Sequence, residues 1–156
     1  MKYYLAIDIG ASSGRHIIGW REDGVIRTKE VFRFPNGVKR ENGHLVWDTD
    51  RLFTEVKVGI KNAFSKYPEI ESLSIDTWGV DFGFLDKKGH LLANPVHYRD
   101  TRTVGMPAYS AETVSADEVY DITGIQVLEL NSLYQLLAVQ KNSPEILDIA
   151  TDMLFV

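Results

Sequence analysis

The chain has 156 residues, 44% of them hydrophobic and 25% charged, which is typical of a globular protein of one domain. Its formal net charge of -5 offers no basic footprint for nucleic acid. The sequence has no cysteine, which excludes disulfides and thiolate metal sites and fits the cytoplasm. No apolar run is long enough to span a membrane, and the first one ends at Asp8, so no secretory signal is expected.

The first residues predict a hairpin with a turn of small residues. Tyr3–Ile9 is an apolar run with one acid, Asp8, and His16–Trp20 is rich in residues that favour strands. The turn between them reads Gly-Ala-Ser-Ser-Gly over residues 10–14, and Arg15 follows it. The pattern therefore predicts two strands joined by a flexible, polar turn.

This turn is a candidate phosphate site. Small residues let backbone N–H groups approach an anion, and hydroxyls and a guanidinium add side-chain donors. Asp8, at the end of the strand, can hold a hydrated Mg²⁺ beside the same phosphates. The spacing matches neither the dinucleotide fingerprint nor the Walker A loop, so an ordinary glycine-rich turn is the alternative interpretation.

The next residues predict a third strand and a loop. Asp23–Gly24 marks a turn before Val25–Phe34, so the first three strands are expected to form an antiparallel meander. The charged segment Val38–Glu41 lies between two Asn-Gly turns, at residues 36–37 and 42–43. We expect this segment to be a solvated loop.

An amphipathic helix follows a short strand at His44–Asp48. Thr49 or Asp50 can cap the helix at its start, and Tyr67–Pro68 ends it. The helix is expected to cross one face of the sheet, because apolar residues recur at helical spacing. These residues are Leu52, Phe53, Val56, Ile60, Ala63, Phe64 and Tyr67.

The segment after the helix contains two acids in apolar surroundings. Ile70–Thr77 predicts a buried strand. Asp76 and Asp81 flank Gly79, and a glycine there indicates a bend or the close approach of a ligand. The acids either face a ligand or are hydrogen-bonded structural groups, and Trp78 is expected in the core.

A second polar cluster follows a predicted strand at His90–Ala93. The segment His97–Thr103 combines an imidazole, a phenol, two guanidiniums and an acid. Polar side chains placed after a strand often contact ligands. A structural Arg–Asp cluster at the surface is the alternative.

Short helices and a last strand complete the chain. Helices are predicted over Val104–Glu112, over Asp117–Thr123, from Asn131 or Ser132 through Lys141, and again from Ser143–Pro144. A strand is predicted from about Met153 to the last residue, and the apolar run there indicates a buried strand. We expect a piece of a longer protein, because chain termini are usually exposed; a strand that completes the sheet is the alternative.

Three segments together resemble the N-terminal domain of the FGGY carbohydrate kinases and, among them, the rhamnulokinases. They are AIDIGASSGR (6–15), IDTWGVDFGFLD (75–86) and HYRDTRT (97–103). Their order and spacing match that family, and NGHLVWD, TGIQ and NSLYQL extend the likeness over nearly the whole chain. The first segment alone marks only the superfamily of actin, sugar kinases and heat-shock ATPases, whereas DTWGVDF is much more specific.

The resemblance implies an α/β fold of the ribonuclease H type, with a mixed sheet. Three antiparallel strands are followed by parallel strands flanked by helices. It also implies transfer of the ATP γ-phosphate, with Mg²⁺, to the 1-hydroxyl of L-rhamnulose. Residues 1–156 would be the N-terminal domain, and a second domain of similar fold, absent from this chain, would form the other side of the cleft.

The resemblance also assigns site residues. The family's ATP phosphate motif falls on Ala11, Ser12, Ser13, Gly14 and Arg15. The acid that organises Mg²⁺ falls on Asp8. The positions that contact the sugar in this family fall on Gly79, Asp81, Tyr98 and Arg99.

The family's catalytic aspartate has no counterpart here, so the base is expected beyond residue 156 and the chain alone is expected to be inactive. A non-catalytic nucleotide-binding module of the actin-like superfamily is the alternative function. A structural α/β domain is a third possibility, which would leave the polar cluster at residues 97–102 without a role.

Overall fold

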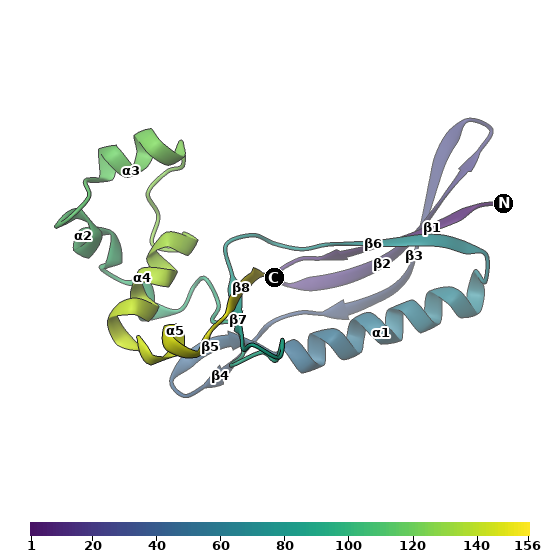
Figure 1. The fold of residues 1–156 in the computed structure, drawn as a ribbon. Coiled ribbons are helices and arrows are strands. Elements are labelled where there is room, and N and C mark those ends of the chain that lie inside the picture. Colours follow the sequence, from purple (N-terminus) through teal and green to yellow (C-terminus); the bar gives the residue numbers. More distant parts are fainter. The chain divides into compact units, whose positions relative to one another are not determined.

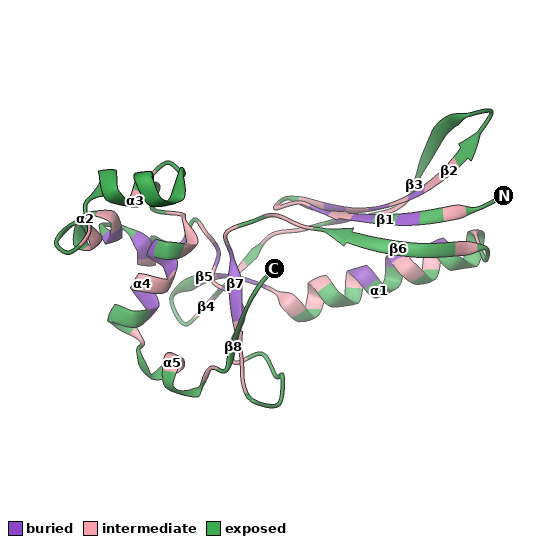
Figure 2. Cartoon of the chain, turned by 45° about the horizontal axis from the view of Figure 1, so that its top comes forward, coloured by how far each residue is buried: buried purple, intermediate pink, exposed green.

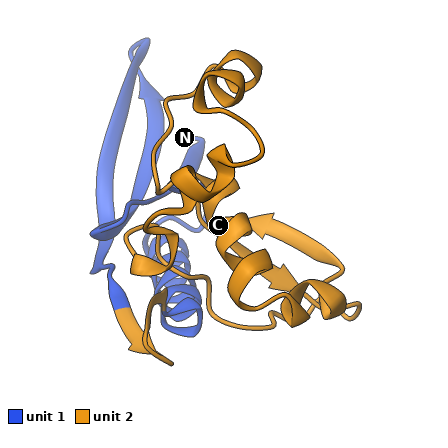
Figure 3. Cartoon of the chain, turned by 90° about the vertical axis from the view of Figure 1, so that its left-hand side faces the viewer, with its two compact units in different colours: residues 1–38, 48–78 blue, residues 39–47, 79–156 orange.

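The computed structural model describes residues 1–156 and divides into two compact units (Figure 3). Unit 1 comprises Met1–Val38 and Asp48–Trp78, and unit 2 comprises Lys39–Trp47 and Gly79–Val156. None of the helices is both long enough and apolar enough to cross a membrane.

Unit 1 is a four-stranded sheet with one long helix (Figure 1). Its elements are β1 (Tyr3–Ile9), β2 (Ser13–Glu22), β3 (Val25–Pro35), α1 (Thr49–Lys66) and β6 (Ile70–Asp76). The strand order is β3-β2-β1-β6. Strands β1, β2 and β3 form the predicted antiparallel meander, and β6 runs parallel to β1. The fold class inferred from the sequence is therefore confirmed.

The core of unit 1 lies between the sheet and α1. Alternate residues of β1 are buried, as expected for a strand with one covered face. The buried apolar side chains of this core are Leu5, Ile7, Ile9, Ile18, Phe34, Val56 and Ala63. The cap of the helix is Asp48, one residue before Thr49 and two before Asp50, because its side chain accepts a hydrogen bond from the Arg51 amide at 3.3 Å.

The prediction that β6 is buried is wrong for the described chain. Leu73 and Ile75 remain 45% and 48% exposed, and Figure 2 shows most of the strand in the colour of exposed residues. The strand pairs with β1 on one side only. The apolar run thus predicted the strand correctly but did not predict how exposed its side chains are.

Unit 2 combines two small sheets with short helices. Its strands are β4 (Val38–Glu41, whose first residue belongs to unit 1), β5 (His44–Trp47), β7 (Phe82–Leu85) and β8 (Asp152–Phe155). Its helices are the 3-10 turn Thr101–Thr103, α2 (Met106–Ala111), α3 (Ala116–Thr123), α4 (Ser132–Asn142) and α5 (Glu145–Ile149). Met106, Tyr134 and Ala138 form a small buried cluster.

Three predictions in unit 2 are corrected. Val38–Glu41 is strand β4 and not a loop, because Asn42 and Gly43 both adopt positive φ and form a two-residue turn that pairs it with β5. His90–Ala93 makes one isolated bridge, between Leu91 and Leu85, instead of a strand. Strand β8 is exposed and pairs antiparallel with β7, outside the four-stranded sheet.

Candidate functional site

The predicted phosphate turn is a tight loop between β1 and β2. The Gly10 amide donates to the Ser13 carbonyl at 2.9 Å. The amide N–H groups of Ala11 and Ser12 donate to no acceptor within the protein. Ser12 is exposed and Ala11 is partly exposed. Two neighbouring, unpaired N–H groups in a loop of small residues are suited to bind an anion.

A carboxylate and a guanidinium lie beside this loop. Asp8 and Arg15 are register partners across β1 and β2, and their side chains form an ion pair. Both side chains are about two-fifths exposed, at 41% and 42%. A ligand can therefore reach both charges, which the sequence predicted as metal and phosphate contacts.

The neighbouring strand adds a cation that the sequence analysis missed. Arg33 on β3 is the register partner of Arg15, and its Nη1 donates to Ser13 Oγ at 3.4 Å. Its Nε also donates to Glu30 at 3.0 Å. This hydrogen bond lowers the pKa of Glu30 and raises that of Arg33. The sequence offered one signal for Arg33, the alternation of side chains between the two faces of β3.

Gly14 has a packing role. A Cβ atom at Gly14 would lie 2.1 Å from the Phe34 ring, far inside contact distance. The glycine is therefore required by the core of unit 1, whatever its relation to phosphate. The turn thus combines one structural glycine with a set of available donors.

The acids near the loop fit a metal bound together with phosphate. Asp76, at the end of β6, is the register partner of Asp8 in the parallel pair. No group of three or more His, Cys, Asp or Glu side chains is arranged to hold a metal ion. Mg²⁺ keeps several waters and uses one or two protein carboxylates with the phosphates of its substrate, so this donor set suits it.

In unit 2, a strained bend joins Gly79 to Asp81. Val80 has φ of 72°, which is a true outlier for a β-branched residue. Its carbonyl accepts hydrogen bonds from Ser132 Oγ at 2.7 Å and from Gln135 Nε2 at 3.2 Å. Open space surrounds the position where a Cβ of Gly79 would lie. Hydrogen bonds to the Val80 carbonyl thus hold the bend in place, whereas the space next to Gly79 is open.

Asp81 has the surroundings of the second alternative in the sequence analysis, a hydrogen-bonded structural acid. It is fully buried and accepts from Trp47 Nε1 at 2.6 Å and from Gln135 Nε2 at 3.1 Å. Direct contact with a sugar would require these bonds to rearrange. Trp47 and Gln135, 34 and 54 positions away in the sequence, were both missed as its partners, because no local pattern identifies them.

Tyr98 and Arg99 line a hollow of about 400 Å³ together with residues 128–130. Their backbone is held by His97, whose Nδ1 accepts from the Arg99 amide at 2.9 Å. The His97 ring stacks on Tyr98, with centroids 4.2 Å apart, and lies 4.5 Å from the Trp47 ring. Burial lowers the pKa of His97, so this ring is neutral at physiological pH.

The alternative of a structural Arg–Asp cluster at the surface holds in part: Arg99 and Thr101 are exposed, but two members of the cluster are buried. His97 and Asp100 are only 8% and 5% exposed. Burial favours the neutral form of Asp100, but hydrogen bonds from the Leu45 amide, His44 and the Arg102 amide outweigh it and lower its pKa. Asp100 is therefore a buried structural anion that ties this segment to β5.

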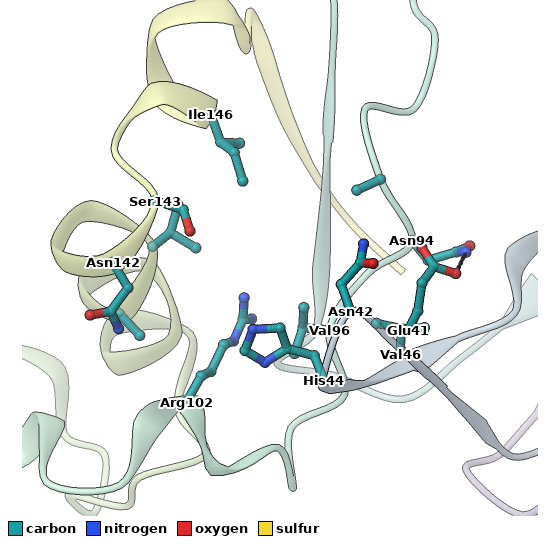
Figure 4. Close-up of a pocket in the computed structure, with 13 residues that line it drawn as sticks. Glu41, Asn42, His44, Val46, Asn94, Val96, Arg102, Asn142, Ser143 and Ile146 are labelled. Atoms are coloured by element: carbon teal, nitrogen blue, oxygen red, sulfur yellow. Dashed lines mark hydrogen bonds between the residues drawn. The ribbon is translucent and has the colours of Figure 1, made fainter.

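A separate cavity of about 210 Å³ in unit 2 contains none of the predicted site residues (Figure 4). His44, Arg102, Asn142 and Ser143 are among the residues that line it. Arg102 Nη2 donates to Gln135 Oε1 at 2.8 Å, which connects this side chain to the network around Asp81.

Comparison with known proteins gives a consistent result. The sequence profile described as "FGGY family of carbohydrate kinases, N-terminal domain" matches residues 3–156. The chain is 42% identical over 152 residues to the rhamnulokinase of Bacteroides thetaiotaomicron and 41% identical over 152 residues to that of Oceanobacillus iheyensis. These alignments cover 97% of this chain but only 31% and 32% of the relatives, so the chain spans about a third of their length.

Solved structures agree on the fold. The xylulose kinase of Rhodospirillum rubrum superposes with a TM-score of 0.80 at 14% sequence identity, over 97% of this chain and 32% of that protein. At this identity the likeness concerns the fold alone.

Proposed function

Because the chain belongs to the FGGY family of carbohydrate kinases and corresponds to their N-terminal domain, we propose that it forms part of the active site of an ATP-dependent sugar kinase. We propose L-rhamnulose as the sugar, phosphorylated at its 1-hydroxyl. The identity of 41–42% with two rhamnulokinases supports this choice.

The loop between β1 and β2 is the proposed phosphate site. The observation that carries this assignment is the pair of unpaired N–H groups on Ala11 and Ser12, next to the charges of Asp8 and Arg15. The N–H groups and the hydroxyls of Ser12 and Ser13 donate to phosphate oxygens, and Arg15 supplies a charge-assisted bond.

Asp8, with Asp76 beside it, would hold Mg²⁺ through its hydration shell. The metal would neutralise charge on the phosphates when bound. Asp8 accepts from Arg15 at Oδ2, and a carboxylate has enough lone pairs to accept at its second oxygen as well.

The sugar site is proposed on unit 2. Tyr98 and Arg99 line the hollow and provide donors for hydroxyl groups, and Gly79 leaves open space for a ligand. Asp81 is buried, so we assign it to the support of this surface through Trp47 and Gln135.

In the proposed reaction, the sugar oxygen attacks the γ-phosphorus, the bond between that phosphorus and the β,γ-bridging oxygen breaks, and ADP leaves. The hydroxyl proton passes to a carboxylate base, which we place in a second domain beyond residue 156. Without that base and the closure of a second domain, residues 1–156 alone should not phosphorylate the sugar.

The test is a coupled assay of ADP release by the full-length protein with ATP, Mg²⁺ and a panel of L-rhamnulose, D-xylulose, gluconate and glycerol. We expect the highest kcat/KM for L-rhamnulose and no sugar-dependent turnover by residues 1–156. Preference for another sugar would overturn the substrate assignment. Nucleotide binding without turnover of any sugar would indicate the non-catalytic nucleotide-binding module instead.

A further inference from the structure

Asn36, the residue that follows β3, holds the proposed phosphate loop through two of the loop's carbonyl groups. The Asn36 amide N–H donates to the Ser12 carbonyl at 2.9 Å. The Asn36 side chain donates through Nδ2 to the Gly10 carbonyl, also at 2.9 Å. One residue, 26 positions further along the chain than Gly10, therefore fixes two carbonyls of the short loop between β1 and β2.

Asn36 is itself held in place. Its Oδ1 accepts from the Gly37 amide at 2.9 Å, which leaves the NH₂ group of the side chain to face Gly10. The preceding residue, Pro35, has a fixed φ, and its carbonyl accepts from Arg51 Nη1 at 2.8 Å. Asn36 thus connects the loop to a segment that is fastened to the first turn of α1.

Fixing a carbonyl also orients the next amide. In a planar trans peptide, the C=O of one residue and the N–H of the following residue point in opposite directions. The Gly10 carbonyl belongs to the same peptide unit as the Ala11 N–H. Since Asn36 holds that carbonyl, it turns the Ala11 N–H away from itself, and this N–H has no acceptor within the protein.

We propose that Asn36 is a positioning residue for the nucleotide: it holds the Gly10–Ala11 peptide so that the Ala11 N–H is preorganised to bind a phosphate oxygen. This inference rests on the proposed function of the loop. A preorganised donor binds an anion more tightly, because the loop does not have to be ordered when the ligand binds.

The same residue also serves a turn, and its two contacts with the loop can be separated. Oδ1 accepts from Gly37, whereas Nδ2 donates to Gly10. In Asn36→Ser, the shorter side chain cannot reach the Gly10 carbonyl, whereas the backbone N–H at position 36 can still donate to the Ser12 carbonyl. The substitution therefore removes the side-chain contact with the loop and keeps the backbone contact.

The experiment compares steady-state kinetics and thermal unfolding of the full-length wild type, Asn36→Ser, and Asn62→Ser on α1 as the matched control. We expect Asn36→Ser to raise the KM for ATP about tenfold, the equivalent of one hydrogen bond. The KM for the sugar and the unfolding temperature should stay close to wild type, and Asn62→Ser should match wild type in both KM values.

An unchanged KM for ATP in Asn36→Ser would overturn the inference. Equal rises in both KM values, with a lower unfolding temperature, would also overturn it, because Asn36 would then serve only the fold. The wild-type assay tests the proposed function separately: a wild type that uses no ATP would refute that function, whatever the variants do.

Discussion

Residues 10–15 in unit 1 and residues 79–99 in unit 2 hold their polar groups in different ways. In unit 1, charged side chains are about two-fifths exposed and two backbone N–H groups are unpaired. In unit 2, the most prominent acid, Asp81, is fully buried and accepts two side-chain hydrogen bonds. The comparison indicates that removing a charge should affect ligand binding in the first region and folding in the second.

The largest expected effect comes from Asp81→Ala. This change removes a buried carboxylate that accepts from Trp47 Nε1 and from Gln135 Nε2, and leaves a cavity in its place. We expect the free energy of unfolding to fall by about 3 kcal/mol, measured by urea denaturation of the full-length protein. A variant as stable as wild type that has lost only sugar affinity would show that Asp81 contacts the substrate directly.

Arg15→Ala should weaken ATP binding and leave stability almost unchanged, which is the reverse of the effect of Asp81→Ala. Charge-assisted hydrogen bonds to phosphate contribute about 1.5–3 kcal/mol, so the KM for ATP should rise about ten- to hundredfold. Stability should change little, because the ion pair with Asp8 is exposed to solvent. Arg27→Ala, in the exposed pair with Glu22, is the matched control. An unchanged KM for ATP would refute the phosphate assignment.

Gly79→Val tests the open side of the bend in unit 2. Apart from Gly79 and its two chain neighbours, no protein atom lies within 4 Å of the Cβ position, so the new side chain should be tolerated by the fold but should obstruct a ligand. We expect about a tenfold rise in the KM for the sugar, little change in that for ATP, and a smaller effect for Gly79→Ala. Equal rises for both substrates would indicate a folding defect.

The smallest effect concerns pH and the two buried histidines. Burial lowers the pKa of His16 in unit 1 and of His97 in unit 2. His16 is fully buried, its Nε2 lies 3.1 Å from the Val56 carbonyl, and its Nδ1 has no partner. Because the folded state binds the proton less readily, stability is complete above the ordinary histidine pKa and is lost as pH falls below it.

We expect the free energy of unfolding to fall at each buried histidine as the pH is lowered from about 7.5 to about 5.5. His16→Leu and His97→Leu should each reduce the slope of the unfolding free energy against pH, measured by denaturation over that pH range. Asn62→Ser, which leaves all four histidines in place, serves as the control and should leave the slope unchanged. A wild type whose stability does not vary with pH would contradict the burial of both rings.

The sequence was sufficient to predict the structure where the residues that determine it are close together in the chain. The turn at residues 10–15 was predicted because its small residues, flanking apolar runs and single acid are contiguous, and the meander follows from the same pattern. It was insufficient where the partners are distant. The burial of Asp81 depends on Trp47 and Gln135. The strand at 38–41 was missed for another reason, because its partner lies just across the Asn42–Gly43 turn and the pairing outweighs the charge of the segment.

Above all, we propose that the loop between β1 and β2 in unit 1 binds phosphate through its backbone N–H groups. The most direct measurement is a crystal structure of the full-length protein with ADP and Mg²⁺. We predict phosphate oxygens within about 3.2 Å of the N–H groups of Ala11 or Ser12, with the Arg15 guanidinium in contact. A nucleotide bound with its phosphates elsewhere, and these N–H groups facing solvent, would contradict the claim.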